Sequence, residues 1–397
     1  MKKIALVNQR YGLEVNGGSE YYTRLIAERL TDAFEVEVIT TKAMDYTDWA
    51  NRYTADEEDI NGVHVRRFTV EKPRAKDFNE YNASYLSRVS EGDRDEAAEQ
   101  VWFDKQGPYC PSAVDYIREH KDDYDAFIFV TYLYYLTVMG MPEVAEKSIF
   151  IPTAHEEPFI RFKLFEWLFP MPKAYVFLTD EEKALVQDLF PETKEIDCRV
   201  MGTGVEVPCE PDGEAFRRKF GITENYIVYV GRIDEGKDCP TLFKYFMEYK
   251  KRRPDSSLKL VLMGKAVCEI PKHQDIISLG FVSEEDKFSG ISAAKALVLP
   301  SKFESLSISV LEAMTLSVPV IVNGVCEVLK GHCTKSNGGL YYMNYFEFEG
   351  IIDYIFTHDK EYSMLCKNAA RYIEKNYRWD VIIDNFQKLI DKISERA

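Results

Sequence analysis

The chain has 397 residues, of which 46% are hydrophobic and 29% are charged. This balance excludes a disordered or collagen-like chain, and the length predicts two or three domains. Lysine and arginine number 50 against 66 aspartates and glutamates, so the net charge is −16 at pH 7. Because a phosphate backbone needs a basic face, this charge argues against nucleic acid as the main ligand, although a single pocket can still be basic.

The eight cysteines have no close regular spacing, which predicts free thiols in a reducing compartment. The apolar run at 4–7 is too short for a signal peptide, and no stretch approaches the ~20 apolar residues that span a bilayer. We therefore expect a cytoplasmic protein that is at most peripheral at the inner face of the membrane.

In the first half of the chain, short apolar runs alternate with longer helical patterns. Residues 19–30 have the spacing of a helix, with Ser19 as its N-cap, and Asn61-Gly62 predicts a hairpin turn. Residues 72–120 are polar and irregular, which predicts an insertion beside the sheet, and a further helix is expected over 180–190. Buried strands are expected at 4–7, 35–41, 126–130, 148–151 and 174–178.

The second half repeats this rhythm after a stretch rich in glycine and proline at 202–213, which has the composition of a linker. A short Gly-Leu-Tyr-Tyr strand and three helical stretches follow the last of its main strands. These observations predict an α/β protein with two doubly wound domains that face a cleft. The main strands of the second domain are expected at 227–230, 258–263, 276–280, 296–300 and 319–322.

Two cations follow the first strand of the second domain. The strand ends at Gly231, and Arg232 and Lys237 lie in the loop before the next helix. Ligands bind at the carboxyl ends of strands in open α/β sheets, and an arginine fork with a lysine point charge suits a diphosphate. The alternative for such a loop, taken by itself, is a solvated turn with surface cations.

Two glutamates follow a later strand of the same domain. Glu304 is in the loop after 296–300, and Glu312 is nearly two turns inside a helix expected from about Leu306. The first amide groups of that helix, at Leu306 and Ser307, are suited to a phosphate, and a deeper carboxylate is suited to a ribose diol. In isolation, two glutamates on a helix are more often a solvated face.

The first domain has two weaker signals. Gly17 and Gly18 precede a helix, which allows close approach of the backbone to a ligand. His155 directly follows the strand at 148–151, so it also lies at the carboxyl end of a strand. A Gly-Gly pair by itself and a single histidine are each weak evidence for a ligand site.

The combination of these motifs is much more specific. Gly17-Gly-Ser-Glu, His155-Glu-Glu-Pro, the Gly231-Arg-Ile-Asp-Glu-Gly-Lys-Asp loop and the segment from Phe303 to Met314 resemble the retaining GT-B glycosyltransferases of the "group 1" family, glycosyltransferase family 4. The resemblance runs from Met1 to about residue 393. It implies an acceptor-side domain of residues 1–203 plus 377–397, whose last helix crosses back from a nucleotide-sugar-binding domain of residues 204–376.

The resemblance also implies roles for single residues. Arg232 and Lys237 would bind the donor diphosphate beside Gly231, Glu304 the donor sugar and Glu312 the ribose. Leu306 and Ser307 would offer amides to phosphate, Gly17 and Gly18 would line the cleft, and His155 would lie against the transferred sugar. The implied activity is retaining, metal-independent sugar transfer to a glycan, lipid-linked or small-molecule acceptor, with a nucleotide sugar as substrate and no cofactor. Its setting would be the synthesis of cell-surface polysaccharide or glycoconjugates.

Three departures from the family pattern concern donor identity. The family more often has His-Asp where His155-Glu156 stands, an aromatic-glycine pair at Leu306-Ser307, and a glycine before the strand that starts at Pro319.

Three other signals are weaker. Two Asp-x-Asp matches, at 93–95 and 123–125, are interpreted as solvated turns or faces, and Cys326, His332 and Cys333 fit no common zinc site, so no metal is expected. The aromatic segment 159–169 is interpreted as a buried helix, with peripheral membrane contact as the alternative.

Two other classes of function stay open. One is a nucleotide-sugar epimerase, and the other is a catalytically inactive partner subunit that binds glycan or nucleotide.

Overall fold

The computed structural model describes residues 1–15 and 17–395, and the chain divides into two compact units. The first unit is Met1–Thr203 together with the chain from Asp380 onward, and the second is Gly204–Trp379. Both units are α/β with mainly parallel sheets, so the predicted pair of doubly wound domains is confirmed.

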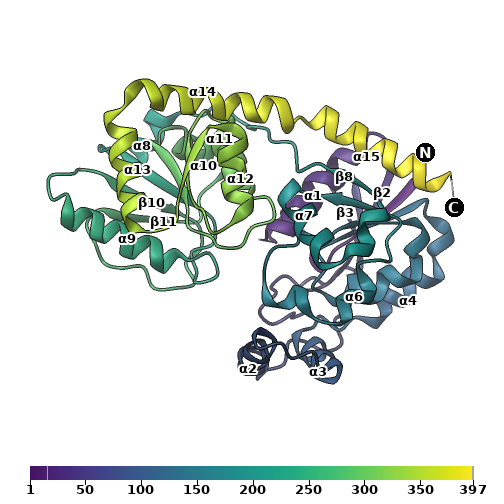
Figure 1. Ribbon diagram of the computed structural model, residues 1–397. Coiled ribbons are helices and arrows are strands. Elements are labelled where there is room, and N and C mark those ends of the chain that lie inside the picture. Colours follow the sequence, from purple (N-terminus) through teal and green to yellow (C-terminus); the bar gives the residue numbers. More distant parts are fainter. Residues whose placement is uncertain (16, 396–397) are drawn as a thin grey trace. The chain divides into compact units, whose positions relative to one another are not determined.

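The first unit is built on an eight-stranded sheet with the order β3-β4-β2-β1-β5-β6-β7-β8 (Figure 1). Every neighbouring pair in it is parallel except β3 and β4. Its strands are β1 (Lys3–Val7), β2 (Glu35–Thr41), β3 (Glu57–Ile60), β4 (Val63–Phe68), β5 (Ala126–Val130), β6 (Ser148–Ile151), β7 (Ala174–Phe177) and β8 (Asp197–Val200). Its helices are α1 (Gly18–Leu30), α2 (Phe78–Ser90), α3 (Glu96–Gln106), α4 (Pro111–Glu119), α5 (Tyr135–Gly140), α6 (Leu164–Leu168), α7 (Asp180–Leu189) and α15 (Trp379–Ser394), with short 3₁₀ turns η1 (Lys121–Asp123), η2 (Met141–Lys147), η3 (Pro158–Arg161) and η4 (Pro191–Glu195).

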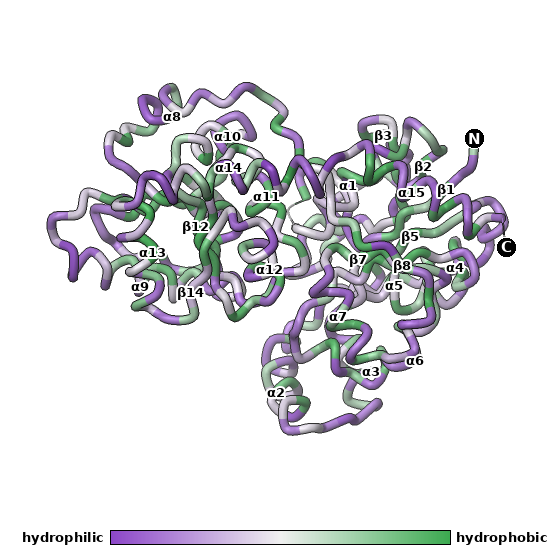
Figure 2. Tube along the Cα trace, turned by 45° about the horizontal axis from the view of Figure 1, so that its top comes forward, coloured by the Kyte–Doolittle hydropathy of each residue, from purple (hydrophilic) through white to green (hydrophobic). Residues whose placement is uncertain are grey.

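The central strands of this sheet are buried along their whole length. Every residue of β5, β6 and β7 is buried, because helices cover both faces of a parallel sheet. Figure 2 shows these strands as hydrophobic segments at the centre of the unit. The predicted strands of the first half are therefore confirmed, whereas β8, whose residues are only partly buried, was not predicted.

Two local predictions for the first unit have different outcomes. The hairpin turn is confirmed: Asn61 and Gly62 have φ angles of 50° and 83° between the antiparallel strands β3 and β4. The prediction of Ser19 as N-cap is wrong. Helix α1 begins at Gly18 with Gly17 as its N-cap, and the Ser19 hydroxyl donates a hydrogen bond to Glu20 Oε2 at 2.9 Å.

The segment 159–169 forms two short helical pieces, η3 and α6, rather than one helix. Most of its apolar side chains are buried, as predicted, because they pack on the inserted helices α2 and α3 and on the aromatic core of the first unit. The Trp102 ring lies 5.2 Å from the rings of Phe159 and Phe162, and the buried Glu99 carboxylate accepts the Lys163 and Leu164 amides at 2.7 and 3.0 Å. Trp167 is the exposed exception, at 42%.

The second unit has a six-stranded parallel sheet with the order β11-β10-β9-β12-β13-β14. All five predicted main strands are confirmed, and the short Gly-Leu-Tyr-Tyr strand forms the β14 edge. The strands are β9 (Tyr226–Val230), β10 (Lys259–Met263), β11 (Ile276–Gly280), β12 (Ala296–Leu299), β13 (Val320–Asn323) and β14 (Gly339–Tyr342). The helices are α8 (Gly213–Phe220), α9 (Cys239–Arg252), α10 (Glu284–Ser292), α11 (Ile308–Thr315), α12 (Glu327–Ser336), α13 (Tyr345–Thr357) and α14 (Asp359–Asn376).

The last helix, α15, crosses back to the first unit, as predicted. Its buried side includes Phe386 and Leu389, and three polar contacts tie it to the amino-end edge of the first sheet. Lys392 Nζ lies 2.6 Å from Asp197 Oδ2, Lys2 Nζ lies 2.7 Å from Asp391 Oδ1, and the Ser394 hydroxyl lies 3.5 Å from the Asp125 carbonyl.

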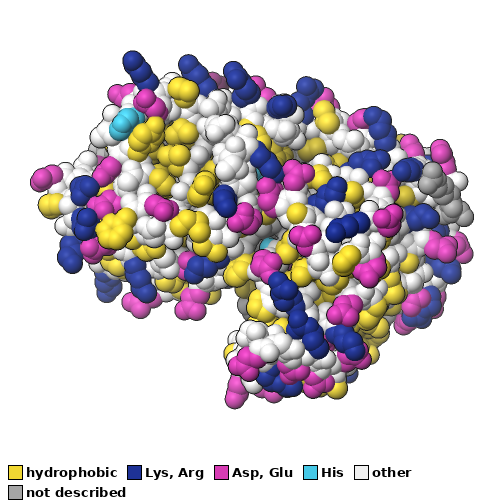
Figure 3. Space-filling model, viewed as in Figure 1, with side chains coloured by type: hydrophobic (Ala, Val, Ile, Leu, Met, Phe, Trp, Pro, Cys, Tyr) yellow, Lys and Arg dark blue, Asp and Glu magenta, His cyan; other side chains and the backbone are white. Residues whose placement is uncertain are grey.

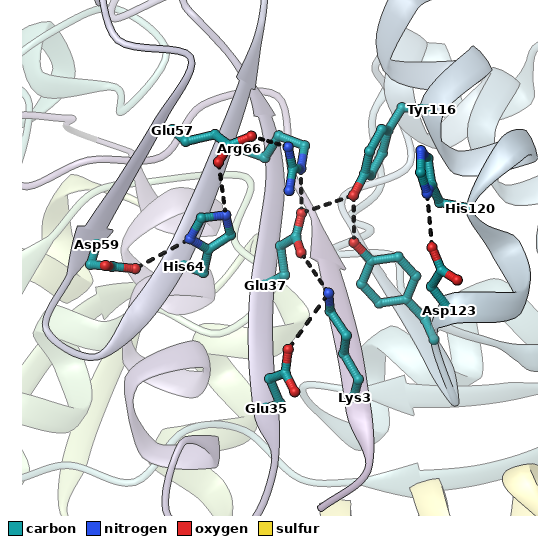
Figure 4. Close-up of polar contacts among 11 residues, drawn as sticks. Lys3, Glu35, Glu37, Glu57, Asp59, His64, Arg66, Tyr116, His120 and Asp123 are labelled. Atoms are coloured by element: carbon teal, nitrogen blue, oxygen red, sulfur yellow. Dashed lines mark hydrogen bonds and ion pairs between the residues drawn. The ribbon is translucent and has the colours of Figure 1, made fainter.

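A buried carboxylate, Glu37, organises the polar contacts on the β1-β2-β4 side of the first sheet (Figure 4). Lys3 Nζ lies 3.1 Å away and Arg66 Nε 2.6 Å away, and the Tyr116 hydroxyl donates to Glu37 Oε1 at 3.3 Å. Burial opposes ionisation of Glu37, but these hydrogen bonds and charges lower its pKa. Lys3 and Glu37 lie toward the amino ends of their strands, so this cluster lies at the opposite edge of the first sheet from His155, which follows the carboxyl end of β6.

The molecular surface carries both signs of charge. Figure 3 shows Lys and Arg side chains interspersed with Asp and Glu over the visible face. Among the described residues, no helix has the length and apolar character needed to cross a membrane.

Candidate functional site

The loop after β9 depends on two glycines. Gly231 has a φ of 145°, and Gly264, at the end of β10, has a φ of 149°, both in the region that favours glycine. A Cβ on Gly264 would lie 1.8 Å from the Gly231 carbonyl oxygen, so no other residue fits there. The backbone of the loop is therefore held close against the neighbouring strand.

Asp234 joins the two cations of this loop. The Arg232 Nε group donates a hydrogen bond to Asp234 Oδ2, and the Lys237 amide donates to Asp234 Oδ1 at 2.8 Å. The Tyr229 hydroxyl donates to the Arg232 carbonyl at 2.6 Å. Asp234, which sequence reasoning passed over, thus holds the side chain of Arg232 and the backbone of Lys237, the two residues that the sequence predicted to act together.

Lys237 also reaches Glu304. Its Nζ lies 2.6 Å from Glu304 Oε1, although 67 positions separate the two residues. The contact forms because β12 pairs directly with β9, which brings the loops at their carboxyl ends together. Arg232, Asp234, Lys237 and Glu304 therefore form one connected polar cluster, and the Glu304 side chain is only 12% exposed.

Glu312 belongs to a second pair in the same unit. It lies on α11, is buried, and its Oε1 accepts a hydrogen bond from Lys287 of α10 at 2.7 Å. Burial raises the pKa of Glu312, and the Lys287 ammonium opposes that shift. A buried carboxylate with one cation retains acceptor capacity for further hydrogen bonds.

Helix α11 starts later than predicted. It begins at Ile308, not near Leu306, and Ser307 is its N-cap with a φ of 66°. Leu306 is buried, and its carbonyl accepts a hydrogen bond from His332 Nε2 at 2.7 Å. The first helical amides are therefore those of Ile308 and Ser309, and Leu306 and Ser307 form the turn that leads into them.

The metal signals have structural explanations. His332 uses its second nitrogen for the Tyr372 hydroxyl at 3.2 Å, and no three His, Cys, Asp or Glu side chains of the described residues group as metal ligands would. Asp123 contacts His120 at 2.8 Å, Asp125 accepts the Lys3 amide at 2.8 Å, and Asp95 caps α3. Asp95, Asp123 and Asp125 therefore each have a local structural partner.

In the first unit, Gly17 and Gly18 differ sharply in their surroundings. A Cβ on Gly17 would lie 2.1 Å from Glu20 Oε2 and 3.0 Å from Arg10 Nη2, whereas a Cβ on Gly18 would meet nothing within 4 Å. Glu20 is buried and accepts hydrogen bonds from Arg10, from Gln9 at 2.9 Å and from Ser19. Only Gly17 is required by close packing.

His155 lies at the carboxyl edge of the same sheet. Its Nδ1 is 3.5 Å from Glu157 Oε1, and the Tyr132 hydroxyl donates to the same oxygen at 2.5 Å. Burial raises the pKa of Glu157, which the nearby histidine and the tyrosine hydrogen bond counteract. The sequence motif contained Glu157, but nothing in the sequence pointed to Tyr132.

Glu182 was also missed as a positioning residue. It is buried on α7, and its carboxylate accepts the amides of Ala154 at 2.6 Å and Leu178 at 2.5 Å. Burial raises the pKa of Glu182 to about 8, although these backbone hydrogen bonds lower it. Because Ala154 precedes His155, Glu182 holds the backbone from which the histidine projects.

Comparison with known proteins identifies the second unit. Residues 212–372 match the family described as "Glycosyl transferases group 1". This match covers most of the second unit and confirms the group 1 part of the resemblance seen in the motifs.

Curated relatives are also named as glycosyltransferases. The chain is 26% identical over 234 residues, 54% of its length, to "Glycosyltransferase 1 domain-containing protein 1" of Xenopus tropicalis. It spans only 33% to 66% of the length of the curated relatives that it matches.

Two solved structures share the whole fold. Sucrose-phosphate synthase from Thermosynechococcus elongatus has a TM-score of 0.70 at 16% identity and 100% coverage of both chains. Anabaena Alr3699/HepE in complex with UDP-glucose has a TM-score of 0.69 at 12% identity, with 99% of this chain and 100% of that chain covered. At these identities the likeness shows the fold, two Rossmann-like domains, and no more.

Proposed function

We propose that the protein is a retaining glycosyltransferase that moves a sugar from a nucleotide-sugar donor to a hydroxyl group of an acceptor. The observation that carries this proposal is the cluster of Arg232, Asp234, Lys237 and Glu304 at the carboxyl ends of β9 and β12. Asp234 holds the Arg232 guanidinium and Glu304 holds the Lys237 ammonium, so both cations are preorganised for a diphosphate. Preorganised charge is the largest contribution to rate acceleration in many enzymes. The UDP-glucose complex of Alr3699/HepE, which shares the fold, supports a nucleotide sugar as donor.

In this proposal each charged residue has one task. Arg232 and Lys237 stabilise the negative charge that grows on the diphosphate as its bond to the anomeric carbon breaks. Glu304 binds hydroxyl groups of the donor sugar, and Glu312 binds the ribose. The acceptor hydroxyl oxygen forms the new bond on the same face, and its proton passes to the departing diphosphate oxygen, so no carboxylate nucleophile is required.

The remaining roles are assigned to backbone groups and to the first unit. The amides at the start of α11, after Leu306 and Ser307, bind phosphate, since a helix N-terminus favours an anion. Gly17, Gly18 and Gly231 leave room for close approach of the ligand, and His155 lies against the transferred sugar. The acceptor is a glycan, a lipid-linked sugar or a small molecule, and the setting is synthesis of cell-surface polysaccharide or glycoconjugates.

A panel of nucleotide sugars tests the proposal. The true donor should raise the melting temperature by mass action, and it should be slowly hydrolysed or transferred with retention of anomeric configuration. A chelator should leave that rate intact, because Arg232 and Lys237 supply the charge stabilisation. Loss of activity with chelator, restored by Mn²⁺ or Mg²⁺, would contradict this part of the proposal.

The same panel separates the alternatives. An epimerase would convert a nucleotide sugar into a different nucleotide sugar with no acceptor present. A partner subunit without activity would bind the nucleotide sugar and leave it unchanged with every acceptor. The intact set of Arg232, Lys237, Glu304 and Glu312 favours the transferase.

A further inference from the structure

Arg74, in the stretch between β4 and α2, has an unusual environment for an arginine. Its guanidinium carbon lies 4.7 Å from the centre of the Phe78 ring, 5.6 Å from that of Tyr46 and 5.8 Å from that of Trp49. The Arg74 amide donates to the Asp48 carbonyl at 3.3 Å, which fixes the backbone. Three aromatic rings therefore orient the guanidinium group and partly shield it from water.

No carboxylate of the described residues forms an ion pair with Arg74, and its Nε is buried without a hydrogen-bond partner. Two acidic residues of the segment that packs beside Arg74 have other partners. Asp48 forms an ion pair with Arg52 at 2.6 Å, and Asp45 accepts the Thr47 amide and hydroxyl at 2.9 and 2.8 Å. Desolvation of a cation that lacks a bonded anion is costly, and burial accordingly lowers the pKa of Arg74.

A second cation adds to this cost. The Arg10 guanidinium carbon lies 5.4 Å from the centre of the same Tyr46 ring, and its charge disfavours that of Arg74. Arg10 is buried and bonded to Glu20, and it also donates to the Met44 carbonyl at 3.1 Å. The folded protein thus holds two arginines against one tyrosine, with a bonded carboxylate for only one of them.

These side chains lie at the edge of the sheet where His155 lies. Arg10 follows β1, Tyr46 follows β2, Arg74 follows β4 and His155 follows β6, and these strands are parallel. Tyr134, after β5, belongs to the same cluster: its ring is 5.3 Å from that of Trp49. Burial and the Glu20 charge raise the pKa of Tyr134 to about 12, although the charges of Arg10 and Arg74 lower it.

We propose that Arg74, supported by Arg10, binds an anionic group on the acceptor, either a phosphate ester or a carboxylate of an acidic sugar. This inference rests on the proposed function, because the carboxyl edge of the first sheet is the side assigned to the acceptor. An arginine fork forms two parallel hydrogen bonds with either group, and an anion there would balance a charge to which no carboxylate of the described residues is bonded. Acceptors without a negative charge are therefore poor substrates.

Calorimetry with four probes tests the proposal on the full chain: inorganic phosphate, glucose 6-phosphate, glucuronate and glucose. At least one anion should bind at least about tenfold more tightly than glucose, and its affinity should fall as ionic strength rises. Preference for glucose 6-phosphate over glucuronate assigns a phosphate ester, and the reverse assigns a carboxylate. If no anion binds better than glucose at millimolar concentration, the proposal is wrong.

Variants tie the binding to Arg74. Arg74→Met keeps the contacts with the aromatic rings and removes the charge, so anion affinity should fall at least about tenfold while the melting temperature stays equal or rises. Arg74→Lys should retain part of the affinity, because it keeps the charge and loses the fork. Lys76→Met, which removes an exposed cation two residues further on, should change neither quantity.

The opposite pattern would overturn the inference. If Arg74→Met lowers the melting temperature and leaves anion affinity unchanged, Arg74 has a structural role only. Nucleotide diphosphate binding, which the proposed function assigns to the second unit, should be the same in wild type and all three variants. Its absence from the wild type would contradict the proposed function instead, so the two failures are distinguishable.

Discussion

Lys237 Nζ donates a hydrogen bond to Glu304 Oε1 at 2.6 Å and so links the loops that follow β9 and β12. The Lys237 amide is itself bonded to Asp234, which also holds Arg232. The positive charge is therefore fixed in place before a ligand arrives. Such a group has little reorganisation to undergo when charge develops on a leaving group.

Replacement of Lys237 by alanine tests this arrangement. Lys237→Ala should lower kcat by ~10²–10³, with a smaller effect on KM, if the lysine acts on the departing diphosphate. Steady-state kinetics with the identified donor measures both quantities. Lys244→Ala, which removes an exposed lysine from α9, is the matched control and should behave as the wild type. An unchanged kcat in Lys237→Ala would mean that Lys237 does not act on the diphosphate and that the loop is a solvated turn with surface cations.

The two glutamates should separate binding of the nucleotide from binding of the sugar. Glu312→Gln should weaken the donor and the free nucleotide diphosphate alike, by ~1.5–3 kcal/mol, because a charge-assisted hydrogen bond to the ribose is lost. Glu304→Gln should leave nucleotide diphosphate affinity nearly unchanged and reduce turnover. Calorimetry with nucleotide diphosphate on both variants decides the matter. Loss of that affinity in Glu304→Gln alone would mean that the roles are reversed.

Adjacent glycines in the first unit provide a test with an internal control. Gly17→Ala places a Cβ 2.1 Å from Glu20 Oε2, so the buried Glu20 and Arg10 pair must shift. We expect a loss of ~1–3 kcal/mol in the free energy of unfolding and a fall in transfer activity. Gly18→Ala meets open space at the first residue of α1 and should be neutral or stabilising by ~0.4–1 kcal/mol. Equal effects in chemical denaturation would show that the contact with Glu20 is unimportant.

Glu182 predicts a distinct pH dependence of stability. Its pKa is raised from 4.5 to about 8 in the folded protein, so the folded state binds the proton more tightly than the unfolded chain does. The stabilisation is complete below about pH 4.5 and is lost as the pH rises through 8, by at most about 1.4 kcal/mol per pH unit for one proton.

Urea unfolding of wild type and Glu182→Gln at several pH values between 5 and 9 measures this effect. The difference in free energy of unfolding between the two proteins should change with pH in the expected direction, since glutamine does not titrate. Glu192→Gln, at an exposed position in η4, should run parallel to the wild type. A pH-independent difference for Glu182→Gln would mean that Glu182 stays ionised throughout.

The strands and the family could be predicted from the sequence because both depend on residues that are close together in the chain. A buried parallel strand is a short continuous apolar run. Runs such as 126–130 and 296–300 can therefore be recognised without knowing which strands lie beside them. Gly231, Arg232 and Lys237 lie within seven positions, so their motif is also local. The first residues of helices were predicted less accurately. The helices that begin at Ile308 and Gly18 start where the backbone turn before them allows, and the sequence pattern does not define that turn.

Side-chain partnerships between distant positions were decided by the tertiary structure. Strand order places β12 beside β9 and β4 beside β2, and only that order brings Glu304 to Lys237 and Arg74 to Tyr46. Asp234 and Glu182 were likewise recognised as positioning residues only from the groups that donate hydrogen bonds to them in the structure. The amino-acid sequence by itself determined which segments form strands and which charged loops follow them. The fold decided which charges are paired and which remain uncompensated, because pairing depends on distances that no linear pattern contains.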